Sequence, residues 1–299
     1  MAELEVMTAP TCRDAAEQGG DMPSQRGGVP RIAVGVGSSA ATHAAVRMAA
    51  REAALRGYEL RLVYGLHRVP EELPDGASFP AAETLLDHAT AAARAVAPQL
   101  TISTVIHEGT QTAALLRESR FAELLVLDAD GLDTSAGWSL DIPAMRLASR
   151  ADCTVLLARD EGRDEWPVLV GVDPSTGGER ALEFAFDAAA LRDSDLVVVR
   201  VGPDDKADPD GVVAAQLAET VEPWQEKYPD VRVRREVRYG EPAPVLIDLS
   251  RDAGLLVVGA CGQRPRSAPL APVAQAVLRH ASCATAIVRR IPPGDHAVR

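Results

Sequence analysis

Two glycines and two arginines in the stretch 259–266 form the arrangement in this chain that is best suited to binding an anion. Gly259 and Gly262 have no Cβ, so the backbone N–H groups beside them can approach a ligand closely. Arg264 and Arg266 add positive charge, and no carboxylate within the loop opposes them. Accessible N–H groups, guanidinium groups and the start of a following helix together attract phosphate. The stretch therefore predicts a phosphate-binding loop, with an empty or structural loop as the alternative.

A second loop has the opposite character, because four aspartates lie within fourteen residues, at Asp128, Asp130, Asp133 and Asp141. Clustered carboxylates can hold a divalent cation. The spacing is not that of an EF-hand loop, and no liganding glutamate follows at the expected place. We interpret the stretch as a solvated acidic loop, keep a divalent-cation site as the alternative, and assign no metal site.

The other reactive side chains form no recognisable catalytic arrangement in the sequence. Six histidines are scattered along the chain without a Ser-His-Asp or Glu-x-x-His pattern. Cys153 and Cys283 each precede a strand, which predicts small buried hydrophobic residues. Cys261 lies inside the glycine loop near Arg264, where a lowered pKa and redox sensitivity are the alternative to an inert thiol. We predict that the protein is not an enzyme.

Alternating strands and helices position these residues. The glycine loop lies between the apolar run Leu255–Val258 and the helical segment Val273–His280, and a second apolar run, Ala284–Val288, follows. Short apolar runs rich in valine are typical of buried strands. Strand, loop, helix and strand form a βαβ unit, which places ligands at its strand-to-helix loops.

The chain contains a tandem duplication. The offset between the copies is 136 residues from Gly35 to Gly171 and 130 residues from Cys153 to Cys283. Each copy alternates five strands with helices, which predicts an α/β fold with a doubly wound parallel sheet and right-handed crossovers. The expected strands are 31–36, 60–64, 101–106, 123–127 and 154–158, then 167–172, 196–201, 231–237, 255–259 and 284–289.

The duplication and the composition together predict the domain organisation. We expect a disordered tail at 1–29, domain 1 at 30–160, a linker at 161–166, domain 2 at 167–291 and a polar tail at 292–299. A net charge of −12 argues against a nucleic acid or an anionic membrane as partner. No run approaches the ~20 apolar residues that span a bilayer. The N-terminus lacks a signal core and the four cysteines form no CxxC pair, so we expect a soluble, cytoplasmic protein.

Three motifs resemble the universal stress protein family: GVDPS at 171–175, the pair Gly259-x-x-Gly262, and LRHASCATAIVRR at 278–290. The tandem type of this family accounts for residues 30–291. The resemblance implies an adenine-nucleotide α-hydrolase-like fold, with strand order 3-2-1-4-5 in each five-stranded sheet. In the ATP-binding members, an aspartate after the first strand and the backbone near the end of the second strand hold adenosine. A loop of pattern G-x2-G-x9-G-(S/T) holds the phosphates, and other members do not bind ATP.

The second half keeps part of this pattern, which makes ATP in domain 2 the one candidate cofactor; no cofactor is assigned as required. The closing Gly-Ser of the loop is replaced by Ala271-Pro272, and the loop is one residue shorter. Pro272 removes an N–H that a phosphate could use, although it can start the next helix without strain. Asp173 with Ser175 also fits a plain turn and helix cap. The candidate nucleotide-binding residues are Gly171, Asp173, Val201, Gly259, Gly262, Arg264, Arg266 and Ala271.

The first half departs from the pattern throughout. Gly37 replaces the adenosine-binding aspartate, Asp128 and Asp141 replace the first and last glycines of the loop, and Ile142 takes the hydroxyl position. A carboxylate ~4 Å from a phosphate repels it by on the order of 4 kcal/mol at an effective dielectric constant of about 20. A lost neutral hydrogen bond costs only ~1 kcal/mol. Because repulsion dominates, we predict that domain 1 does not bind ATP.

The resemblance implies a tandem universal stress protein, a non-catalytic cytoplasmic protein that regulates the response to stress. An ATP-binding switch in domain 2 is one alternative, and a slow nucleotide hydrolase is another. The last strands, 154–158 and 284–289, are edge strands in the expected order, and edges need a partner. We therefore expect the two domains to pair as a pseudo-dimer. We also expect a homodimer of whole chains and an unidentified regulatory protein as partner.

Overall fold

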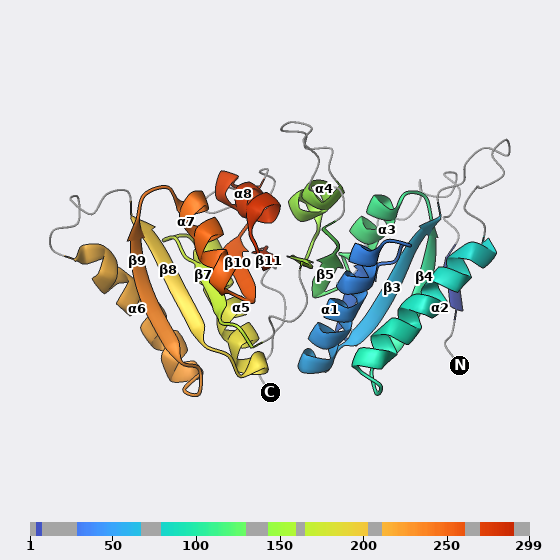
Figure 1. Cartoon of the computed structure of the whole chain (residues 1–299), viewed down its shortest axis with the longest axis horizontal. Helices are drawn as coiled ribbons and strands as arrows, with labels where there is room; N and C mark the ends of the chain where they lie inside the picture. Colours follow the sequence, from blue (N-terminus) through green and yellow to red (C-terminus); the bar gives the residue numbers. More distant parts are fainter. Residues whose placement is uncertain are drawn as a thin grey trace, which may run out of the picture.

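Strands and helices alternate along the described chain. The computed structural model describes residues 4–7, 29–66, 79–129, 143–159, 165–202, 211–260 and 270–289. The first half of the chain (blue to green in Figure 1) and the second half (yellow to red) lie side by side, and helices pack against their strands.

The described part of the first half has the predicted alternation. Its strands are β2 (Arg31–Gly35), β3 (Glu59–Leu66), β4 (Ile102–Glu108), β5 (Leu124–Leu127) and β6 (Thr154–Leu157). Its helices are α1 (Ala40–Arg56), α2 (Phe79–Val96), α3 (Gln111–Glu118) and α4 (Pro143–Arg150). Ser39 caps the start of α1 by accepting a hydrogen bond from Thr42 N, and the left-handed Gly57 ends this helix.

The second half repeats this order. Its strands are β7 (Val168–Gly171), β8 (Leu196–Gly202), β9 (Val233–Tyr239), β10 (Leu255–Gly259) and β11 (Ala284–Val288). Its helices are α5 (Thr176–Arg192), α6 (Val212–Lys227), α7 (Pro242–Leu249), the short 3-10 turn η2 (Ser250–Asp252) and α8 (Pro272–His280). Every predicted strand is present, with ends shifted by at most two residues.

Within each half the strands follow the predicted order 3-2-1-4-5, counted from the first strand of that half. The first half runs β4-β3-β2-β5-β6, and the second runs β9-β8-β7-β10-β11. The expected pairing of the two last strands is present, because β6 lies antiparallel to β11 with Leu157 opposite Thr285. This pairing corrects the prediction of two separate five-stranded sheets. It satisfies the free edge of each half and joins all strands into one eleven-stranded sheet.

A short strand extends the sheet beyond β4. Leu4–Met7 form β1, parallel to β4, within the segment that the sequence predicts as a disordered tail. Residues 1–3 and 8–28 of that segment lie outside the described residues. The sequence analysis missed β1 because a four-residue strand is too short to give a reliable hydrophobic pattern.

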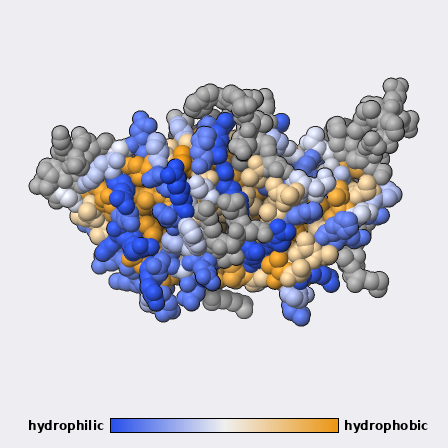
Figure 2. All heavy atoms as spheres, viewed as in Figure 1, coloured by the Kyte–Doolittle hydropathy of each residue, from blue (hydrophilic) through white to orange (hydrophobic). Residues whose placement is uncertain are grey.

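Hydrophobic cores lie on both faces of the sheet and extend across both halves. One core packs the sheet against α1, α2, α5 and α6, and the other packs it against α3, α4, α7 and α8. A parallel sheet covered on both faces has strands that are apolar on both sides, and all four residues of β5 and of β6 are buried. On the outer surface, hydrophilic residues are interspersed with hydrophobic ones in the view of Figure 2.

Two arginines connect the halves across the β6–β11 seam. Arg159 follows β6 and donates from Nη2 to the carbonyl of Leu278 in α8 at 2.5 Å. Arg289 follows β11, donates from Nε to the carbonyl of Ala148 in α4 at 3.0 Å, and also bonds the carbonyl of Ser149. The two arginines are equivalent in the repeats, 130 residues apart, so each reaches a helix of the other half. Carbonyl groups in the last turn of a helix favour such cations.

Candidate functional site

Two hollows lie at the carboxyl ends of the parallel strands, one in each half. The first has a volume of about 400 Å³ and is lined from β2, β3, α3, β5 and α4. The second has a volume of about 150 Å³ and is lined from the equivalent elements β7, β8, α7, β10 and α8. Crevices outside the carboxyl ends of the strands are the usual ligand sites of doubly wound sheets. The hollows therefore occupy the positions expected for nucleotide sites.

A glutamine side chain lies across the end of β3 in the first hollow. Gln111 Oε1 accepts a hydrogen bond from Gly65 N at 2.5 Å, and Gln111 Nε2 donates to the Val63 carbonyl at 2.8 Å. A Cβ on Gly65 would lie 2.5 Å from Gln111 Cα, so this close approach requires glycine. An amide offers one donor and one acceptor side by side, as an adenine edge does. Gln111 therefore occupies the strand-end backbone groups that were expected to hold adenosine.

A carboxylate lies at the end of β5 in the same hollow. Asp128 accepts a hydrogen bond from Thr42 Oγ1 at 2.7 Å, and this hydroxyl is 3.0 Å from Ser39 Oγ at the cap of α1. Asp128 lines the hollow together with Gly37. Negative charge thus lies at the first position of the loop expected to bind phosphate. The remaining aspartates of the predicted acidic loop, at 130, 133 and 141, lie outside the described residues.

In the second hollow the carboxylate follows a different strand. Asp173 follows β7, lines the hollow and accepts a hydrogen bond from Ser175 Oγ. Ser175 also caps α5, because its Oγ accepts from Gly178 N at 3.2 Å. A Cβ on Gly178 would lie 2.2 Å from the Asp173 carbonyl oxygen, so the turn requires glycine. The turn-and-cap interpretation of this segment is confirmed, and the Asp173 carboxylate remains at the wall of the hollow.

The structure brings most of the described candidate residues together. The second hollow is lined by Gly171, Asp173, Val201, Gly259 and Ala271. Pro272 starts α8, as predicted. Gly262, Arg264 and Arg266, together with Cys261, lie outside the described residues, so the tip of the predicted phosphate loop is not placed.

Gln111 is the residue that the sequence analysis missed. Its counterpart in the second half is Pro242, 131 residues later, which starts α7 and lines the second hollow. A proline side chain has no hydrogen-bonding group and cannot form the two bonds that Gln111 forms. The signal in the sequence was the unequal pair Gln111 and Pro242 at the start of equivalent helices.

Comparison with known proteins agrees with this geometry. The model of the universal stress protein family matches residues 28–159 and 167–289. The chain belongs to the universal stress protein family. A universal stress protein of Mycolicibacterium smegmatis is 32% identical over 259 residues, which cover 78% of this chain and 87% of that protein. A universal stress protein of Mycobacterium tuberculosis is 34% identical over 262 residues, which cover 78% of this chain and 86% of that protein.

The tandem arrangement of this universal stress protein also agrees with a solved structure. A universal stress protein from Archaeoglobus fulgidus shares 14% sequence identity with the chain, and the similarity in fold has a TM-score of 0.69. It covers 87% of this chain and 96% of the Archaeoglobus chain. In the described part of the present chain, no helix is both long and apolar enough to cross a membrane. The same residues contain no group of three or more potential metal ligands.

Two cysteines of this universal stress protein are buried, as predicted. Cys153 and Cys283 are free thiols packed in the core that includes α4 and α8. Burial, reinforced by the charges of Glu123 and Asp152, raises the pKa of the Cys153 thiol to about 12. Because the thiolate is the reactive form, Cys153 has the properties of a structural residue.

Proposed function

We propose that this protein is a non-catalytic regulator of the stress response whose first domain does not bind ATP. The observation that carries the proposal is the Gln111 amide on the end of β3. A nucleotide base in this hollow would have to displace two hydrogen bonds, a penalty of about 2 kcal/mol or roughly thirtyfold in affinity. The Asp128 carboxylate adds repulsion against phosphate.

An ATP-binding switch in domain 2 is the second candidate function. Asp173 lines the second hollow at the position expected to hold adenosine, and Pro242 cannot imitate a base as Gln111 does. The sequence of the loop 261–269 contains two arginines and no carboxylate. These features favour an anion in domain 2 over domain 1, with Gly262, Arg264 and Arg266 as the proposed phosphate-binding residues.

A slow nucleotide hydrolase has the least support. Among the described residues, each hollow is lined by one carboxylate and by no histidine, cysteine or lysine. General acid–base catalysis requires a proton donor and a proton acceptor placed on the reacting group. A single carboxylate does not supply that pair.

The remaining features of the proposed function concern location and assembly. We propose a cytoplasmic protein that forms a homodimer and acts through an unidentified regulatory partner. Closed two-fold assembly is the common form of soluble homo-oligomers. Light scattering coupled to gel filtration tests the homodimer, because a mass near the 31.6 kDa of a single chain would contradict it.

Calorimetric titration of the full chain with ATP and Mg²⁺ tests the nucleotide proposals. We expect any saturable binding to be abolished by Gly262→Asp, which puts a carboxylate into the loop of domain 2, and weakened by Asp173→Ala. The matched change in the first domain, Asp128→Asn, should leave binding unchanged. Loss of binding in Asp128→Asn alone would place the nucleotide in domain 1 and contradict the proposal. Phosphate release above the protein-free rate would contradict the non-catalytic function.

A further inference from the structure

A third cavity lies at the seam between the two halves, away from both hollows. Its volume is about 360 Å³. Val168, Leu255 and Ala284, the first residues of β7, β10 and β11, line it, so it lies at the amino ends of these strands. The two hollows described above lie at the carboxyl ends. Because α1 and β6 come from one half and α5 from the other, the cavity exists only when both halves are joined.

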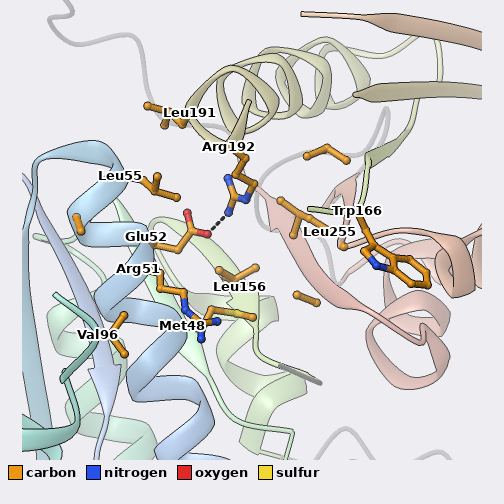
Figure 3. A pocket seen from close by; sticks show the side chains of 14 residues that line it. Met48, Arg51, Glu52, Leu55, Val96, Leu156, Trp166, Leu191, Arg192 and Leu255 are labelled. Atoms are coloured by element: carbon orange, nitrogen blue, oxygen red, sulfur yellow. Dashed lines mark hydrogen bonds and ion pairs between the residues drawn. The ribbon is translucent and has the colours of Figure 1, made fainter. Parts of the chain in front are cut away.

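The walls of the seam cavity are mainly apolar. Leu156 and Leu255 lie between the two halves, and Leu55 and Trp166 project from opposite sides (Figure 3). Leu55 is 41% exposed and Trp166 is 40% exposed, and both belong to the small group of large hydrophobic side chains that the described surface leaves exposed. Their gathering around one cavity favours an apolar ligand body.

A charged group lies on one wall of the cavity. Glu52 is 4% exposed and accepts a hydrogen bond from Arg192 Nη2, drawn as a dashed line in Figure 3. Arg56 Nε lies 3.5 Å from the same carboxylate, and Arg56 Nη1 donates to Asp187 at 2.6 Å. Glu52 is therefore already neutralised by two guanidinium groups. Arg51 lines the cavity beside Glu52 and adds a further positive charge.

The charged residues that line the cavity are two arginines and one glutamate, which gives the wall a net positive charge of one. Burial lowers the pKa of Arg192 to about 10, so its guanidinium remains charged at neutral pH. A cationic ligand would face Arg51 and Arg192, whereas an anionic headgroup would meet two planar guanidinium donors. Carboxylates pair well with such donors.

We propose that the seam cavity binds a small amphipathic anion, with a carboxylate headgroup at Arg51 and Arg192. The apolar body of this ligand packs against Leu156, Leu255 and Trp166. The cavity volume of about 360 Å³ corresponds to about a dozen water-sized groups, which suits a single medium-length acyl chain. A two-chain phospholipid is too large. The ligand bridges the two halves, so its binding stabilises their pairing.

Calorimetric titration of the full chain with decanoate below its micellar concentration tests this proposal. We expect saturable binding at one site per chain, with decan-1-ol and decyltrimethylammonium binding at least tenfold more weakly because they lack the anionic head. Arg51→Gln should weaken decanoate about tenfold, and Arg94→Gln, at an exposed position of α2, is the matched control. Equal binding of decanoate and decan-1-ol, or no effect of Arg51→Gln, would overturn the proposed headgroup site.

A second pair of variants tests the location. Ala54 is exposed and lines the cavity, so Ala54→Trp should fill it with little effect on folding and abolish decanoate binding. Ala91→Trp places the same side chain at an exposed position outside the cavity and should bind normally. Unchanged binding in Ala54→Trp would exclude this cavity. Binding to phosphatidylglycerol vesicles as strong as to decanoate would also contradict the proposal, because it would indicate surface binding. None of these outcomes depends on ATP binding.

Discussion

Gln111 joins the start of α3 to the end of β3 through its bonds to Gly65 N and the Val63 carbonyl. Replacing it by alanine removes the side-chain acceptor of the Gly65 N–H. We expect Gln111→Ala to lower the free energy of unfolding by about 1–3 kcal/mol, measured by urea denaturation. Gln99→Ala, at an exposed position, is the control and should change it by less than about 0.5 kcal/mol. Equal effects of the two substitutions would contradict a structural role of the amide.

The buried Cys153 thiol gives a second prediction for a single residue. With its pKa raised to about 12, only about one thiol in 10⁴ is ionised at pH 8. We expect iodoacetamide to leave Cys153 unmodified in the native protein and to alkylate it in urea, as measured by peptide mass spectrometry. Rapid alkylation of the native protein would contradict its burial. Because the unfolded thiol ionises near pH 9, this residue also makes the fold less stable as the pH rises from about 9 to 12.

At the scale of elements, Arg159 and Arg289 couple the last strand of each half to a helix of the other. Replacing Arg289 by methionine keeps much of its apolar stem but leaves the carbonyls of α4 without these donors. We expect Arg289→Met to lower the free energy of unfolding by about 1.5–3 kcal/mol, measured by urea denaturation. Arg251→Met, at an exposed site on η2, is the control. An effect of Arg289→Met no larger than that of the control would exclude a stabilising role at the seam.

The elements themselves were largely predictable, because the apolar runs of β5 and β10 and the repeat spacing are local properties of the sequence. The pairing of β6 with β11 followed from the expected edge positions of these strands. The amide of Gln111 on the end of β3 was not predictable in this way, since it joins residues 46 positions apart. The seam cavity was also missed, because it forms only when both halves pack together.

At the scale of the whole molecule, the halves share one sheet and the hydrophobic core on each face extends across both of them. Unfolding one half would expose the edge of β6 or β11 and part of both cores. We therefore expect a single thermal unfolding transition, with equal calorimetric and van't Hoff enthalpies. Two resolved transitions would contradict this coupling and would indicate independently stable domains.

The central claim is that the two homologous domains differ in their capacity for nucleotide, with domain 1 closed by Gln111 and Asp128. The most direct test is equilibrium dialysis of the full chain with radiolabelled ATP and Mg²⁺ at saturating concentration, counting ATP bound per chain. We expect no more than one ATP per chain, and any bound ATP should be lost in Gly262→Asp. Two ATP per chain, or one that persists in Gly262→Asp, would contradict the claim.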